Sequence, residues 1–166
     1  MTQPATSPTS DSTAAAPTCP PAGIDPRGPR FGAGITAVTL LAVIALATSG
    51  FGVASAVLLA VIAALFAWGA FAGIRAHPYG LLFARLVRPR LKPPEGLENP
   101  APPTFAQGVG LTVTLVGLVL FAVGLPLAIP VSAAAAFIAA FLNAVFGYCL
   151  GCQIYLLLVR VHVIHP

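Results

Sequence analysis

Charged residues are scarce in this chain, and two long segments have none. Only 7% of the 166 residues are charged, 58% are hydrophobic, and the mean hydropathy is +0.95. Soluble domains carry about 25% charged residues, so the composition excludes a soluble fold and indicates a bilayer protein. The net charge of +4 does not indicate nucleic-acid binding, because no basic face is interleaved with aromatic residues.

Other absences restrict further the class of protein to which the chain can belong. Three cysteines are too few for a disulfide framework, and the first 18 residues lack the basic stretch and apolar core of a secretory signal peptide. The apolar segments contain no Asp, Glu, Lys, Arg or His, which counts against an ion pump or a proton-coupled transporter. No motif indicates a cofactor, and we expect none.

The two apolar segments, 31–74 and 105–159, predict four transmembrane helices. The first is interrupted at 48–52 and the second at Pro126 and Pro130, because glycine turns and paired prolines end helices. A span needs about 20 residues. We therefore expect an all-α, four-helix transmembrane bundle with helices near 31–47, 52–74, 105–125 and 131–159. The last range is longer than a span requires, so we expect it to tilt, to extend into the cytosol, or to unwind near Gly147 or Gly151.

The basic residues predict the topology. All eight lie before the first helix, between the second and third, or after the fourth, so both termini and the central loop are expected to be cytoplasmic. Residues 1–28 are rich in Pro, Thr, Ser and Ala and predict a disordered tail, followed by the membrane domain (29–160) and a short cytoplasmic tail (161–166). Within the central loop, 78–88 predicts a short amphipathic helix on the membrane interface, with a charged connector as the alternative.

Small residues predict where helices touch. Glycines recur every seven residues at 110, 117 and 124, and a second series runs along the last helix at Ala136, Ala140, Ala144, Gly147 and Gly151. A short pattern, Pro-x-Phe-x-x-Gly, begins at both Pro29 and Pro103, which suggests two hairpins arranged as a parallel repeat.

Two cysteines in the last helix are the strongest candidates for chemistry. Cys149 and Cys152 stand three positions apart, on adjoining faces of a helix, and a straight helix would put Cys152 about 12 Å from its cytoplasmic end. We expect a reversible disulfide with backbone distortion near Gly147 or Gly151, and Tyr148, Gly151, Tyr155 and Asn143 as supporting residues. The alternatives are that the cysteines are packing residues or that they bind a metal.

The remaining polar residues favour simpler interpretations. His162 and His165 would complete a zinc set only if the chain unwound, so we expect no metal. His77 is expected to be a helix cap or a surface residue. Asn143 and Gln107 are expected to form interhelical hydrogen bonds, and Cys19 to be a bystander.

Several of these motifs resemble one family. The residues Asp25-Pro26-Arg27-x-x-Arg30-Phe31, Phe105-Ala106-Gln107 and Gly147-x-Cys149-Leu150-Gly151-Cys152 are similar to those of domain-of-unknown-function family 4395, a set of small bacterial membrane proteins with four helices. Thr104 stands where the family usually has an arginine. The resemblance implies a multi-pass protein of the bacterial plasma membrane, with a cytosolic thioredoxin-like or rhodanese-like protein as its partner.

These observations lead to two hypotheses of function. The first is a thiol–disulfide or sulfur-relay protein in which Cys149 and Cys152 cycle between dithiol and disulfide. The second is a non-enzymatic bundle that acts as a scaffold or passes a small solute, with structural cysteines. Whether the protein is an enzyme is left open by the sequence.

Overall fold

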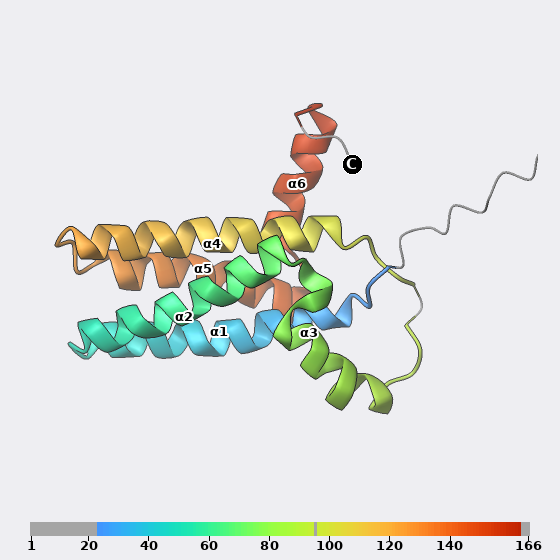
Figure 1. Ribbon diagram of the computed structural model, residues 1–166, viewed down its shortest axis with the longest axis horizontal. Helices are drawn as coiled ribbons and strands as arrows, with labels where there is room; N and C mark the ends of the chain where they lie inside the picture. The colour runs from blue at the N-terminus through green and yellow to red at the C-terminus, as the bar shows by residue number, and fades with distance from the viewer. Residues whose placement is uncertain (1–22, 95, 164–166) are drawn as a thin grey trace, which may run out of the picture.

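The computed structural model describes residues 23–94 and 96–163, and in these ranges every regular element is a helix apart from one isolated bridge (Figure 1). The prediction of a disordered tail falls mostly on residues 1–22, outside the described ranges, as do Cys19 and His165. The long elements are α1 (Arg27–Thr48), α2 (Gly52–Phe71), α4 (Ala101–Ala122), α5 (Ala128–Phe146) and α6 (Leu150–Arg160).

Four of these helices are long and apolar enough to cross a bilayer. They are α1, α2, α4 and α5, with 19 to 22 residues each and hydropathies of 2.0 to 2.3. Large apolar side chains on their outer surfaces are exposed, such as Phe71 at 86% and Val53 at 76%, which is the arrangement expected where lipid is the solvent. The predicted four-helix membrane bundle is confirmed.

Helix boundaries follow the turn residues, with small corrections to the predicted ranges. Gly50 and Gly124 have φ of +86° and +96°, the left-handed conformation that suits glycine, and each lies in the turn that closes a hairpin. Helix α4 begins at Ala101 rather than near 105, because proline is accepted in the first turn of a helix. Helix α1 likewise begins at Arg27, inside the segment predicted to be disordered.

The predicted continuous helix over 131–159 is wrong, and the alternative of unwinding near Gly147 is right. Helix α5 ends at Phe146, and Gly147, with φ of +69°, caps it through an N–H bond of 3.0 Å to the Asn143 carbonyl. Arg30 of α1 donates to the Val145 carbonyl at 3.2 Å, placing a cation at the negative end of α5. The chain then turns, and α6 leads away across the bundle axis (Figure 1).

The four spans form two hairpins, α1–α2 and α4–α5, which both begin at the same end of the bundle (Figure 1). The closest neighbours between hairpins are α1 with α5 and α2 with α4. This pairing is the one expected if a two-fold axis along the bundle relates the hairpins, as in the predicted parallel repeat. The end at which the hairpins begin also carries the described basic residues, and we call it the basic end.

Packing is tightest in the half of the bundle away from the basic end. Leu40, Val43 and Leu59 are fully buried there against Ile129 and Ala133. Beside this core a Cβ on Gly117 of α4 would overlap the Ser132 side chain of α5. The glycine series on α4 therefore does mediate contact.

The glycine series does not form one stripe facing one helix, however. Gly117 faces α5, a Cβ on Gly110 would lie 2.8 Å from Phe66 of α2, and Gly124 lies in a turn. The second series of small residues, predicted along the last helix, does not form one continuous contact surface either. Ala136 is buried and Ala144 lies near Gly34 of α1, whereas Gly147 and Gly151 leave the helix on which the series was predicted.

Gly117→Ala is expected to destabilise the bundle by about 1–3 kcal/mol, the usual cost of overpacking a well-packed contact. The matched control is Gly108→Ala in the same helix, where a new Cβ meets no atom within 4 Å. Thermal unfolding in detergent should show a lower midpoint for Gly117→Ala and an equal or higher midpoint for Gly108→Ala. Equal midpoints for the two variants would contradict this close contact.

The connection between α2 and α4 is helical for much of its length. It contains η1 (Ile74–Ala76), α3 (Pro78–Leu82), a π-helical turn η2 (Phe83–Val87) and η3 (Arg88–Arg90). Phe83 is buried and its ring lies 5.8 Å from that of Phe31, which ties this short helix to α1. A helix over 78–88 is therefore present, and its place on a membrane interface stays a prediction.

Candidate functional site

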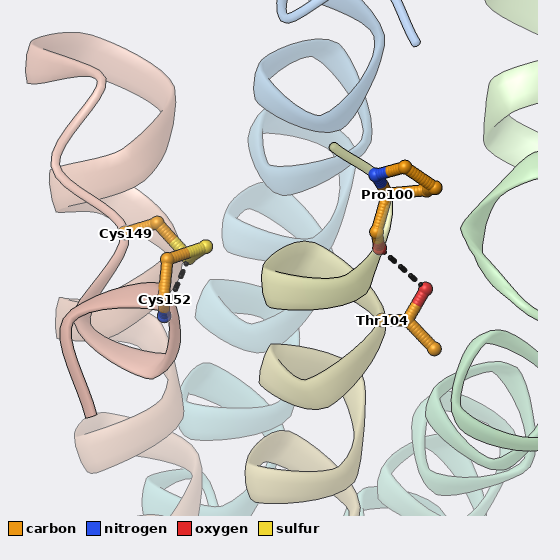
Figure 2. The surroundings of a disulfide bond; sticks show 4 residues. All are labelled: Pro100, Thr104, Cys149 and Cys152. Atoms are coloured by element: carbon orange, nitrogen blue, oxygen red, sulfur yellow. Dashed lines mark hydrogen bonds between the residues drawn. A yellow bond between two sulfur atoms is a disulfide. The ribbon is translucent and has the colours of Figure 1, made fainter. Parts of the chain in front are cut away.

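Cys149 and Cys152 lie where α6 begins, at the basic end of the bundle. Their Cα atoms are 5.2 Å apart and their sulfurs are joined as a disulfide. Cys149 is the N-cap of α6, with extended backbone, and its sulfur accepts a hydrogen bond of 3.3 Å from the backbone N–H of Cys152 (Figure 2). An N–H donor and the positive end of a helix dipole both stabilise a thiolate, and both act on the Cys149 sulfur.

The helix break corrects the predicted depth of this pair. A straight helix would put Cys152 about 12 Å inside the end of the span. Instead the pair follows the break at Gly147, beside the Arg30 side chain that caps α5. Both cysteines are half-buried at the end of the bundle, not inside its apolar span.

Close contact with α4 holds α6 in place. Gly151 is buried, and a Cβ there would lie 2.6 Å from both Cα and Cβ of Ala106. One turn later, the Tyr155 ring packs 5.6 Å from the Phe105 ring of α4. These two contacts fix the helix whose first turn carries the cysteine pair, and a supporting role of Gly151 and Tyr155 in its chemistry stays a prediction.

The other two supporting residues have different positions. Tyr148 lies in the break before α6 and is 50% exposed, so it does not share a helix face with Tyr155. Asn143 is in the last turn of α5. The predicted interhelical hydrogen bonds of Asn143 and Gln107 are not formed with any described residue, and both side chains instead line a cavity.

The cavity occupies the half of the bundle next to the basic end and has a volume of about 760 Å³. Its inner walls come from α1, α2, α4 and α5, and its mouth from α6, α3 and the segments before α1 and α4. Small residues of α5, Ala135, Ala136, Ala139 and Ala140, leave much of this space open. Cys149 lines the cavity, while Cys152 does not.

A buried histidine also lines the cavity, and sequence reasoning recognised only part of its role. His77 caps α3, as predicted: its Nδ1 accepts the Tyr79 N–H at 3.2 Å. It is not a surface residue, since only 4% of it is exposed and its Nε2 lies 3.2 Å from the Leu65 carbonyl. These bonds require a neutral ring with the proton on Nε2. Burial lowers the pKa of His77, partly offset by the bond to Leu65, and burial raises the pKa of Tyr79.

Acidification is expected to destabilise the fold through His77. A lowered folded-state pKa means that the unfolded chain binds more protons below about pH 6.5, so stability is lost as pH falls below that value. Protonated Nδ1 can no longer accept the Tyr79 N–H. The measurement is the thermal unfolding midpoint between about pH 8 and about pH 5, the range in which histidine titrates. As the pH falls across this range, the midpoint should decrease less in His77→Asn than in wild type. A His162→Asn control should follow wild type, because His162 is exposed.

The described residues do not supply further metal ligands near the two cysteines. No group of three or more His, Cys, Asp or Glu side chains comes together in residues 23–94 and 96–163 in a way that could hold a metal ion. His162 lies just after the far end of α6, away from the cysteines at its start.

Thr104, at the position where the family usually has arginine, stabilises the start of α4. Its hydroxyl accepts a hydrogen bond from the Ile74 N–H and donates one of 2.7 Å to the Pro100 carbonyl (Figure 2).

The chain belongs to the family described as domain of unknown function DUF4395, whose model matches residues 24–160. This range covers all four spans, the cavity-lining helices and the cysteine pair. No curated protein and no solved structure matches the chain. It is therefore a multi-pass membrane protein of this family.

Proposed function

We propose that this protein is a membrane thiol–disulfide exchange protein in which Cys149 forms the bond to the partner and Cys152 resolves it. The observation that carries the proposal is the position of Cys149. It is at once the disulfide partner of Cys152, the N-cap of α6 and part of a cavity wall. Two cysteines that served only as packing residues would need none of these features.

The exchange proceeds by two substitutions at sulfur. A thiolate of the partner attacks Cys149, breaking the Cys149–Cys152 bond, and Cys152 leaves as a thiolate that takes a proton. The partner's second thiolate then attacks the mixed disulfide and releases Cys149. The partner loses two electrons and becomes a disulfide, while the membrane protein gains two and becomes a dithiol. The same steps run in reverse when the partner is the oxidant.

The partner is a cytosolic thioredoxin-like or rhodanese-like protein. The described basic residues gather at the end of the bundle that carries the cysteines, and basic residues are retained on the cytoplasmic side of bacterial membranes. Both termini then lie in the cytoplasm, and the pair faces cytosolic proteins. The helix break at Gly147 places the cysteines at the end of the bundle instead of inside a continuous transmembrane helix. This position gives the thiols the access to water that thiolate formation requires.

Mass-shift alkylation in native membranes tests the proposal. In a Cys19→Ser background, oxidised membranes should give no tag and reduced membranes two tags, with the change reversed by a second oxidation. A Cys149→Ser, Cys152→Ser double variant should give no tag in either state. If the pair stays untagged after reduction in wild type, or if it reacts identically in both states, the cysteines are packing residues and the scaffold interpretation replaces the proposal.

A further inference from the structure

The cavity beside Cys149 has the dimensions and composition of a ligand site. Its volume of about 760 Å³ lies within the roughly 300–1,000 Å³ of small-molecule pockets. The opposite half of the bundle is densely packed, so the open half is not a general looseness of the fold. A membrane bundle can close the space between its helices with larger side chains, yet here α5 supplies alanines along this wall.

The distribution of charge restricts what the cavity can hold. Its charged lining residues are Asp25, Arg75 and Arg88, and all three lie outside the four spanning helices, at the mouth. The part of the wall contributed by the spans carries no charge. An ion would lose its hydration there without a counter-charge, so the inner cavity suits a neutral molecule.

Polar and aromatic groups restrict the ligand further. The side-chain amides of Gln107 and Asn143 line the cavity from α4 and α5, and neither bonds to a described residue, so their N–H groups are available to carbonyl oxygens. Three aromatic rings, Phe66, Tyr79 and Phe83, also line it and provide surfaces for a flat ring. Together these groups match a neutral ring compound that bears carbonyl oxygens.

We propose that the cavity binds a membrane quinone, which accepts the electrons of the reduced Cys149–Cys152 pair. This inference rests on the proposed function, because it assigns the electron acceptor of the same site. The dithiol loses two electrons and two protons, the two S–H bonds are replaced by one S–S bond, and the quinone oxygens gain two O–H bonds as hydroquinone. Cys149 lines the cavity and Cys152 lies next to it, so the sulfur nearest the ring is the one that also meets the partner. Electrons then flow from cytosolic dithiols to the quinone pool.

Duroquinone is a suitable probe, because its ring is fully methylated and does not readily add thiols. We expect saturable binding of one duroquinone per oxidised protein in equilibrium dialysis. Ala139→Phe fills the cavity wall and should raise the Kd at least about tenfold, equivalent to about 1.4 kcal/mol. The matched control is Ala60→Phe, an exposed position on α2 outside the cavity, which should leave the Kd unchanged. Gln107→Leu should also weaken binding and provides a second test if Ala139→Phe does not fold.

Electron transfer is measured separately by mixing anaerobically reduced protein with duroquinone. One duroquinone should be reduced per protein, with return of the Cys149–Cys152 disulfide. Cys152→Ser, at a position outside the cavity lining, should abolish the reduction while it keeps the binding. Absence of saturable binding, equal binding by wild type and both cavity variants, or binding without reduction would each overturn the quinone inference. If dithiol reagents still exchange with Cys149 in that case, the proposed function stands without the quinone. If the pair changes redox state with neither dithiol reagents nor duroquinone, the proposed function fails as well.

Discussion

When the oxidised, disulfide form of the proposed partner is supplied, replacement of Cys152 by serine is expected to trap Cys149 in a mixed disulfide: the Cys149 thiolate attacks the partner's disulfide, and one partner sulfur leaves as a thiolate. Cys149 has the hydrogen bond from the residue 152 N–H and the helix N-terminus, both of which belong to the backbone and survive the substitution. The resolving sulfur is gone, so the second substitution cannot occur within the protein. The trapped complex should appear as a higher-mass species on non-reducing gels and disappear on reduction.

The matched control is Cys149→Ser, which keeps Cys152 in the first turn of α6, where its sulfur is not at the N-cap position. The Cys152 sulfur lacks the backbone N–H donor that stabilises a Cys149 thiolate, so we expect less trapped complex in this variant. Both variants belong in a Cys19→Ser background. Equal trapping by the two variants would show that the two sulfurs are equivalent and would contradict the role given to Cys149.

Gly151→Ala is expected to displace α6 from α4 and to disturb the cysteine pair. The new Cβ would lie 2.6 Å from the Cα of Ala106, and a backbone atom cannot move aside as a side chain can. We expect a loss of about 1–3 kcal/mol in unfolding free energy, as for other overpacked contacts. The Phe105–Tyr155 contact should loosen at the same time.

The specific readout for Gly151→Ala is the disulfide, since many substitutions lower stability. With α6 displaced, Cys149 loses its fixed position at the cavity wall, so the rate of exchange with a dithiol reagent should change together with the thermal midpoint. Gly108→Ala is again the control and should alter neither. A variant with normal stability and normal exchange would contradict the tight Gly151–Ala106 contact.

The sequence predicts the spans well because their signal is local. Bilayer thickness sets the length of each apolar segment, and glycine and proline mark the turns, so α1, α2 and α4 fall within a few residues of the predicted ranges. The end of α5 was predicted only as one of several alternatives, namely unwinding near Gly147 or Gly151. Glycine alone does not end a transmembrane helix, and the side chain that caps the exposed carbonyls, Arg30, lies 115 residues away in the chain.

The site was predictable only in part. The spacing of Cys149 and Cys152 identifies the pair, and Gly151 and Tyr155 fall near it in any helix. The cavity depends on which helices face each other, so neither the alanines of α5 nor the buried position of His77 could be assigned to it from their local sequence. The position of Tyr148, between the end of α5 and the start of α6, depends on where the helix breaks.

The central claim is that Cys149 and Cys152 form a reversible disulfide at the cytoplasmic end of the bundle. The most direct test is labelling of sealed inside-out and right-side-out vesicles with a membrane-impermeant maleimide mass tag, before and after reduction, in a Cys19→Ser background. The account predicts two tags per chain, only after reduction and only in inside-out vesicles. Labelling without reduction, labelling from the outer face, or no labelling in either kind of vesicle after reduction would contradict it.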